Sequence, residues 1–253
     1  MSWLRLLVVL LTTMNLAFGQ SRPKEHQDSP EAVALAQLGF TYSKSGNNTK
    51  AIETLKRAIQ LEPELAEAHY FLAATYNNMG LYPDAVLEFK EAIGLKPEWA
   101  EAYSGLGVSY NCLKLFDESV KSLQHALKLA PDWAQPYVNL SVTYTNQRRF
   151  QEAAEASQQA LRLEPNLAEA HYRLGIAYGH LRKHKEAVDC FTHAILLRPE
   201  YAEAHMDLGV IYLLQNKRPE AIEQYRRLQD LNPSLATELF KVIYSGKVLT
   251  VSQ

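Results

Sequence analysis

The chain lacks the features that most enzymes and nucleic-acid-binding proteins carry. Its 253 residues have a formal net charge of −2 with no block of like charge, which argues against binding nucleic acid by bulk electrostatics. No glycine-rich phosphate loop, nucleophile elbow or Cys-x-x-Cys pair is present. We therefore expect no enzymatic activity, no cofactor and no metal site.

What the chain does have is a fixed period. Six prolines are each 34 residues from the next: Pro63, Pro97, Pro131, Pro165, Pro199 and Pro233. A tyrosine recurs with the same period, four residues after a leucine, at Tyr42, Tyr76, Tyr110, Tyr144, Tyr178 and Tyr212. That spacing places the leucine and the tyrosine on one helical face. A period of this length is the mark of a helical solenoid.

Each period predicts two helices. In the second repeat we predict one helix from about Ala66 to Met79, a turn at Gly80, and a second helix from Pro83 to about Leu95. The periodic proline ends the second helix, because the residue before a proline is pushed out of the helical region. The residue after each leucine is small: Gly39, Ala73, Gly107, Ser141, Gly175 and Gly209. An interior glycine costs about 1 kcal/mol in a helix, so we expect these positions to let two helices approach closely.

This pattern resembles the tetratricopeptide repeat (TPR) family. The matching features are the leucine and small-residue pair, the tyrosine, the small residue opening the second helix, an alanine series and the closing proline. The resemblance covers Ala32 to Leu235 and implies an all-α, right-handed superhelical α-solenoid. Leu228 replaces the expected alanine, so the last repeat is expected to contact something other than a seventh repeat. An amphipathic segment from about Ala236 to Tyr244 is the predicted capping helix, offering Leu239, Phe240, Ile243 and Tyr244.

The predicted organisation has four parts. Residues 1–19 form a signal peptide, residues 20–31 a flexible linker, residues 32–235 six TPR repeats, and residues 236–253 a C-terminal capping helix and tail. The predicted repeats are 32–65, 66–99, 100–133, 134–167, 168–201 and 202–235.

The N-terminal segment predicts export. Arg5 precedes an apolar run from Leu6 to Leu11, and small residues at Ala17 and Gly19 come just before Gln20. This is typical of a secretory signal peptide cut after about Gly19, and so of a periplasmic or secreted protein. The alternative is a membrane anchor formed by an uncleaved segment 1–19, although a span needs roughly 20 apolar residues.

The resemblance implies that a partner binds the concave face, which the first helix of each repeat lines in this family. The candidate partner-binding residues there are Glu67, Tyr70, Phe71, Asn77, Asn78, Glu101, Asn111, Asn139, Asn146, Glu169, Tyr172, Arg173 and Glu203. Asparagines can pair with the backbone of an extended peptide because each has a donor and an acceptor. Alternatively, they only favour the turn that follows.

Two other groups of candidates have alternatives of their own. The glutamates lie in the first helical turn, where the helix dipole alone favours them. The aromatic residues Tyr70, Phe71 and Tyr172 are either anchors for a ligand or part of the core.

Histidines and cysteines complete the candidates for chemistry. His69, His171 and His205 share one repeat position with Tyr103 and Tyr137, which indicates a packing position. Cys112 and Cys190 lie two repeats apart, or roughly 20 Å if each repeat advances by one helix diameter. A disulfide needs Cα atoms within about 7 Å, so we expect two free thiols, with Cys190 packed as a small apolar residue.

The sequence thus predicts an exported, non-enzymatic scaffold or adaptor that binds a partner peptide or helix in a concave groove. The alternative is a membrane-tethered assembly factor or a subunit of an envelope complex. We expect a protein or peptide partner and no nucleic acid, with membrane contact only if the N-terminal segment stays uncleaved.

Overall fold

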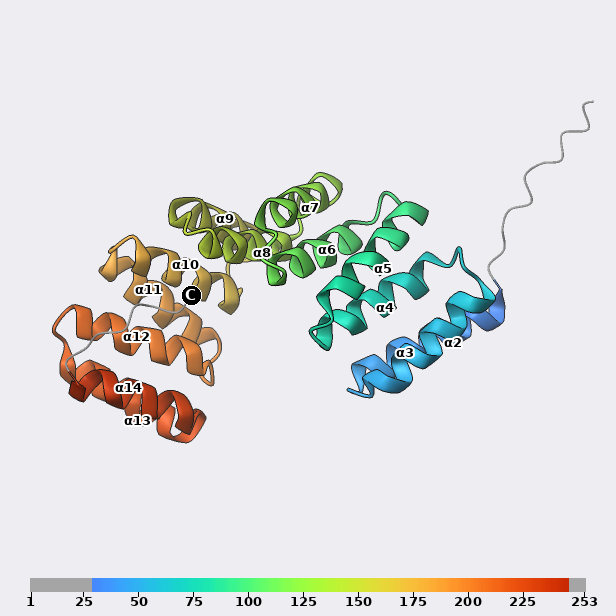
Figure 1. The fold of residues 1–253 in the computed structure, drawn as a ribbon. Helices are drawn as coiled ribbons and strands as arrows, with labels where there is room; N and C mark the ends of the chain where they lie inside the picture. Colours follow the sequence, from blue (N-terminus) through green and yellow to red (C-terminus); the bar gives the residue numbers. More distant parts are fainter. Residues whose placement is uncertain (1–28, 246–253) are drawn as a thin grey trace, which may run out of the picture.

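A computed structural model describes residues 29–245, and in these residues the chain forms thirteen helices and no strand (Figure 1). The helices are α2 (Pro30–Lys44), α3 (Asn48–Leu61), α4 (Ala66–Asn78), α5 (Tyr82–Leu95), α6 (Ala100–Cys112), α7 (Phe116–Leu129), α8 (Ala134–Asn146), α9 (Phe150–Leu163), α10 (Ala168–His180), α11 (His184–Leu197), α12 (Ala202–Leu214), α13 (Arg218–Leu231) and α14 (Pro233–Ser245). The predicted signal peptide, most of the predicted linker and the tail after Ser245 lie outside the described residues.

The helices pack as successive pairs along a curved arch. Each even-numbered helix from α2 to α12, called here an inner helix, packs on the odd-numbered helix that follows it, called an outer helix. Neighbouring inner helices contact one another, whereas no two outer helices in the described residues do. The inner helices therefore lie on the concave side, and Figure 1 shows α6, α8 and α10 inside the arch with α7 and α9 outside. The all-α solenoid is confirmed.

Small residues bring the helices of each pair together, as predicted. A Cβ atom added to Gly107 in α6 would lie 2.6 Å from Cγ of Leu123 in α7, too close for any side chain. The small residues that open the outer helices are fully buried: Ala51, Ala85, Ser119, Ala153, Ala187 and Ala221. The core is thus a continuous row of close contacts between inner and outer helices.

Three histidines join neighbouring repeats, which confirms the predicted packing position. His69 Nε2 lies 3.0 Å from the carbonyl oxygen of Pro63, and His171 and His205 make the same contact with Pro165 and Pro199 at 2.9 and 3.1 Å. Each ring therefore ties an inner helix to the proline that closes the repeat before it.

Helix α14 caps the solenoid. It contacts both α12 and α13, the two contacts that the inner helix of a further repeat would make. Leu239 is fully buried and packs with the fully buried Leu228, the residue that replaces alanine in the repeat pattern. Of the other predicted capping side chains, Ile243 is buried, whereas Phe240 and Tyr244 are 44% and 55% exposed, and the Phe240 ring contacts Tyr225 of α13 with ring centroids 5.6 Å apart. The helix also begins earlier than predicted, because Pro233 occupies its first turn instead of only closing the sixth repeat.

Candidate partner-binding site

Four predicted residues lie together in one groove on the inner surface. Tyr70, Asn77 and Asn78 from α4 and Glu101 from α6 line a groove of about 400 Å³, called here the inner groove. Its other lining residues include Phe89, Ser104, Gly105, Cys112 and Trp133. Because α4 and α6 are neighbouring inner helices, equivalent positions of the two repeats face the same space.

Aromatic rings give the inner groove an apolar wall. The Tyr70 ring lies 4.5 Å from the Trp99 ring and 5.8 Å from the Phe89 ring, measured between centroids. Phe89 reaches the groove from the outer helix α5 because Gly105 leaves room, since a Cβ there would lie 2.4 Å from the Phe89 ring. Burial raises the pKa of the Tyr70 hydroxyl, and the nearby charge of Glu101 adds to this. The Tyr70 residue is only partly buried, so part of its surface remains accessible to a ligand.

Most of the predicted asparagines bind neighbouring repeats. Asn77 accepts a hydrogen bond of 2.8 Å from Ser109, and Asn139 donates one of 3.3 Å to Ser104. Asn146 donates to Asn111 over 3.0 Å. Asn78 is exposed. The amides therefore stabilise the stacking of repeats, and a row of peptide-binding asparagines stays a prediction.

The remaining candidates do not join the inner groove. Tyr172 is only 4% exposed, and its hydroxyl donates a 2.9 Å hydrogen bond to the buried Asp207. Burial raises the pKa of Tyr172, and Asp207 adds to this. The prediction that Tyr172 anchors a ligand is therefore wrong. Its ring belongs to the core, which was the alternative that the sequence left open.

Phe71 and four charged candidates also lie outside the groove lining. The four are Glu67, Glu169, Arg173 and Glu203. Phe71 stacks on Phe40 at 4.7 Å. Two of the glutamates form ion pairs, Glu67 with Lys96 at 3.5 Å and Glu169 with Arg173 at 3.3 Å. Glu203 is exposed on α12. The predicted residues thus form one local site rather than a continuous stripe along the concave face.

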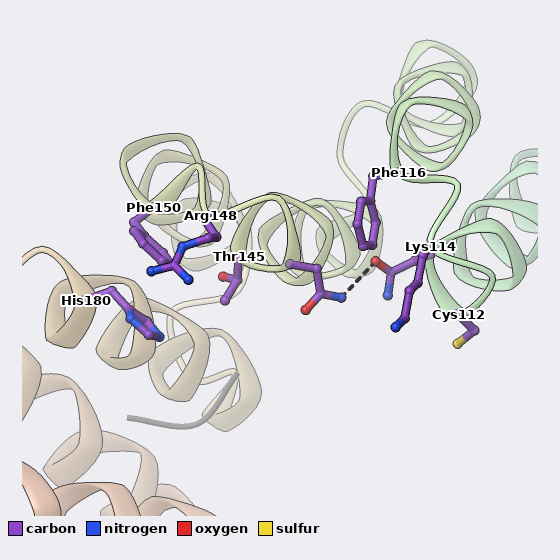
Figure 2. Close-up of a pocket in the computed structure, with 9 residues that line it drawn as sticks. Cys112, Lys114, Phe116, Thr145, Arg148, Phe150 and His180 are labelled. Atoms are coloured by element: carbon purple, nitrogen blue, oxygen red, sulfur yellow. Dashed lines mark hydrogen bonds between the residues drawn. The ribbon is translucent and has the colours of Figure 1, made fainter. Parts of the chain in front are cut away.

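A second cleft adjoins the inner groove and contains residues that the sequence did not single out. It has a volume of about 540 Å³ and lies at the turns after α6 and α8 and the end of α10 (Figure 2). The predicted residues Asn111 and Asn146 line it, and Cys112 lines both the cleft and the inner groove. Because its charged residues are Lys114 and Arg148, we call it the basic cleft.

The two basic residues stand on an unusual backbone. Lys114 and Arg148 have φ angles of 61° and 62°, in the left-handed region that glycine adopts most easily. Repeats 1 and 2 place Gly46 and Gly80 at the same turn position, with φ angles of 78° and 73°. A lysine or arginine at a position occupied elsewhere by the turn glycine was the sequence signal that could have pointed to this cleft.

Aromatic side chains complete the basic cleft. Figure 2 shows Phe150 beside His180 at one end and Phe116 near Lys114 at the other. The Phe150 and His180 rings stack with centroids 4.2 Å apart and planes 6° from parallel. The cleft therefore offers flat apolar surfaces next to positive charge.

The described part of the chain meets the requirements of neither a metal site nor a membrane-spanning helix. Among residues 29–245, no three His, Cys, Asp or Glu side chains are placed to hold a metal ion. In the same residues, no helix is both long enough and apolar enough to span a bilayer.

The paired helices, the 34-residue period and the inner-face site define a tetratricopeptide-repeat solenoid. Within that class, the chain belongs to the family described as the cilia and flagella-associated protein 70 C-terminal domain, whose model matches residues 6–238. The match begins inside the segment that we predicted to be a signal peptide. No match was found among the curated proteins.

Several solved structures share the fold. A chain of the APC/C hetero-tetramer Cut9-Hcn1 has a TM-score of 0.75 at 21% identity, over 93% of this chain and 45% of that one. The chain thus spans less than half the length of that relative. PilF of Pseudomonas aeruginosa has a TM-score of 0.71 at 22% identity, over 84% and 97% of the two chains. YrrB, described as a TPR protein with an unusual peptide-binding site, has a TM-score of 0.56 at 23% identity, over 75% and 99%. At these identities the likeness shows the fold alone.

Proposed function

We propose that this protein is a non-enzymatic scaffold that holds an extended segment of a partner protein in the inner groove. The observation that carries the proposal is that the partly exposed Tyr70 and the exposed Asn78 line the same groove. An aromatic ring in a concave site anchors apolar side chains, and an amide offers one donor and one acceptor to a peptide backbone. That YrrB is described as having a peptide-binding site, within the same fold, agrees with this use of the surface.

A site-specific crosslink tests the groove. A photo-crosslinking amino acid at Asn78 is expected to capture a partner in the native cell, because this side chain lies at the groove and is exposed. The matched control places the same amino acid at Lys121, which is exposed on the outer helix α7. Adding Tyr70→Ala should lower the crosslink yield at Asn78 by about tenfold, since hot-spot aromatics contribute about 1.4 kcal/mol or more. Equal capture at both positions would refute the proposal that the partner binds in the inner groove.

We further propose that the scaffold works outside the cytoplasm, as a periplasmic or secreted protein released after about Gly19. The apolar run from Leu6 to Leu11 and the small residues before Gln20 support this setting. The alternative remains a membrane-tethered assembly factor or envelope subunit anchored by residues 1–19. Mass spectrometry of the N-terminus separates the two, because a new terminus near Gln20 supports export and an intact Met1 in the membrane fraction supports the anchor. An intact Met1 in the soluble fraction would contradict both.

A further inference from the structure

We propose that the basic cleft is a second binding site, which takes an acidic segment of a partner polypeptide with an apolar side chain between its carboxylates. This inference rests on the proposed scaffold function and adds to it the chemistry of the bound segment. The basic cleft lies next to the inner groove, and Cys112 belongs to both linings. One extended chain can therefore occupy both.

The charge of the basic cleft is available to a ligand. Lys114 and Arg148 are exposed, and no hydrogen bond or ion pair within residues 29–245 engages either side chain. Of the nearby acids, Glu152 pairs with Arg149, whereas Asp117 accepts a 2.9 Å hydrogen bond from the neutral Gln147 and keeps its negative charge. The two cations Lys114 and Arg148 outnumber the remaining charge of Asp117, so the net charge at the basic cleft is positive and attracts an acidic ligand.

The walls of the cleft suit a polypeptide rather than a bare anion. Phe116 and Phe150 are half-buried, so each ring presents part of its surface to the cleft. The Asn146 to Asn111 hydrogen bond uses one donor and one acceptor of the two amides and leaves further donors and acceptors for a peptide backbone. A segment that places acidic residues on either side of an apolar one matches both features.

The same turn position carries a third cation. Arg182 lies two repeats after Lys114 and one repeat after Arg148, and it has a φ of 59°. Three consecutive repeats thus place a lysine or arginine on a left-handed backbone. Glycine adopts this conformation without steric strain, whereas lysine and arginine are strained in it. The charges are held one repeat apart, a spacing suited to an extended acidic segment.

Peptide titrations test this inference on the full chain. The probe is a fluorescein-labelled twelve-residue peptide that alternates glutamate or aspartate with leucine or phenylalanine, and its partner is the same peptide with amides in place of all carboxylates. The acidic peptide is expected to bind at least tenfold more tightly at low salt, with an advantage that shrinks as salt screens the charges. Equal binding of the two peptides would overturn the proposal.

The matched variants use the turn geometry to protect the fold. Lys114→Gly with Arg148→Gly removes both charges while suiting the left-handed backbone, and it should weaken the acidic peptide at least tenfold. Lys128→Gln with Arg162→Gln removes the same net charge from exposed positions on α7 and α9 outside the basic cleft and should leave binding unchanged. Equal loss in both pairs would mean that only overall charge matters, which also overturns the proposal.

Two further outcomes separate this inference from its neighbours. Tyr70→Ala should lower the groove crosslink about tenfold yet leave the acidic peptide bound, so the inner groove and the basic cleft can fail independently. Self-association of the unmodified chain that disappears in the glycine pair would make a second copy the occupant, and this too would overturn the proposal.

Discussion

Repeats 1 and 2 turn between their helices on Gly46 and Gly80, whereas repeats 3, 4 and 5 make the same turn on Lys114, Arg148 and Arg182. The backbone is the same in both regions, with φ angles between 59° and 78°. The difference therefore lies in what each turn displays. Glycine relieves the backbone and displays nothing, while a basic residue accepts strain and places a charge at the edge of a cleft.

Repeat 2 also differs from repeats 1, 3 and 5 in where a side chain of its outer helix packs. In repeat 3, Leu123 fills the space above Gly107 of its own repeat, while in repeat 2 the equivalent Phe89 presses on Gly105 of the next repeat. Repeat 2 can therefore have Ala73 where repeat 3 requires Gly107. This shift brings an aromatic ring into the inner groove.

The largest expected effect separates core packing from turn strain. Gly107→Leu should destabilise the fold by about 3 kcal/mol, because any side chain there meets Leu123 and overpacks the core. The control is Gly94→Leu in α5, where an added Cβ finds nothing within 4 Å and the better helix former should gain several tenths of a kcal/mol. Urea unfolding of both variants measures the difference, and similar midpoints would contradict the packing account.

Exchanging the turn residues tests the central comparison directly. Gly80→Lys should cost about 1 kcal/mol, because it forces a side chain onto a left-handed backbone, and Lys114→Gly should gain up to about 1 kcal/mol. Thermal unfolding checks both. If Lys114→Gly were destabilising, the lysine would be making a structural contact and the strain argument would fail.

The pH dependence of the free energy of unfolding distinguishes His69 from His205. His69 Nδ1 lies 2.6 Å from a carboxylate oxygen of Glu88, whereas His205 meets the neutral Gln224 at 2.7 Å. Burial lowers the pKa of His69, but the hydrogen bond and charge of Glu88, together with the Pro63 carbonyl, outweigh it and raise the pKa overall. The stabilisation is therefore full below the unfolded value of 6.5 and is lost as pH rises through the folded pKa.

Glu88→Gln should accordingly lower stability by about 1 kcal/mol at pH 6 and by much less at pH 9. Urea midpoints at the two pH values measure this. The reciprocal change, Gln224→Glu, should add stability at pH 6. A cost of Glu88→Gln that is the same at both pH values would show that the contact does not depend on the charge of the imidazole.

The smallest effect is chemical and leaves the fold intact. Cys112 is exposed and Cys190 is buried, and burial raises the pKa of Cys190 to about 12. A maleimide should therefore label Cys112 within minutes at pH 7.5 and leave Cys190 unmodified until the chain unfolds. Mass spectrometry counts the labels, and Cys112→Ser is the control that should remove the label. Double labelling of the folded protein would place Cys190 outside the core.

The sequence predicted the helices closely because each local signal agreed with the period. In repeat 2 the predicted helices end at Met79 and begin at Pro83, and the observed ones end at Asn78 and begin at Tyr82. The Leu228 substitution also led correctly to the capping helix. The pattern could not tell that Phe240 stays exposed, because that depends on the angle at which α14 meets the end of the solenoid.

The site was less predictable because its chemistry depends on contacts between repeats. A single repeat does not reveal that Asn146 bonds Asn111, or that Asp207 draws Tyr172 into the core. Burial of a tyrosine is decided by the residue one repeat later, which a pattern taken from a family does not specify. The basic cleft was missed for a related reason, since a lysine in a turn is ordinary until its backbone angle is known.

The fastening of neighbouring repeats changes along the arch. Near both ends, His69, His171 and His205 clasp the preceding loop, while in the middle the amide of Asn77 and the pair of Asn111 and Asn146 do the fastening along the inner wall. A ligand that formed hydrogen bonds with these amides in place of their present partners would break the bonds between the repeats that it contacts. Occupancy and curvature would then be mechanically linked, so that the pitch of the superhelix reports whether its middle is filled.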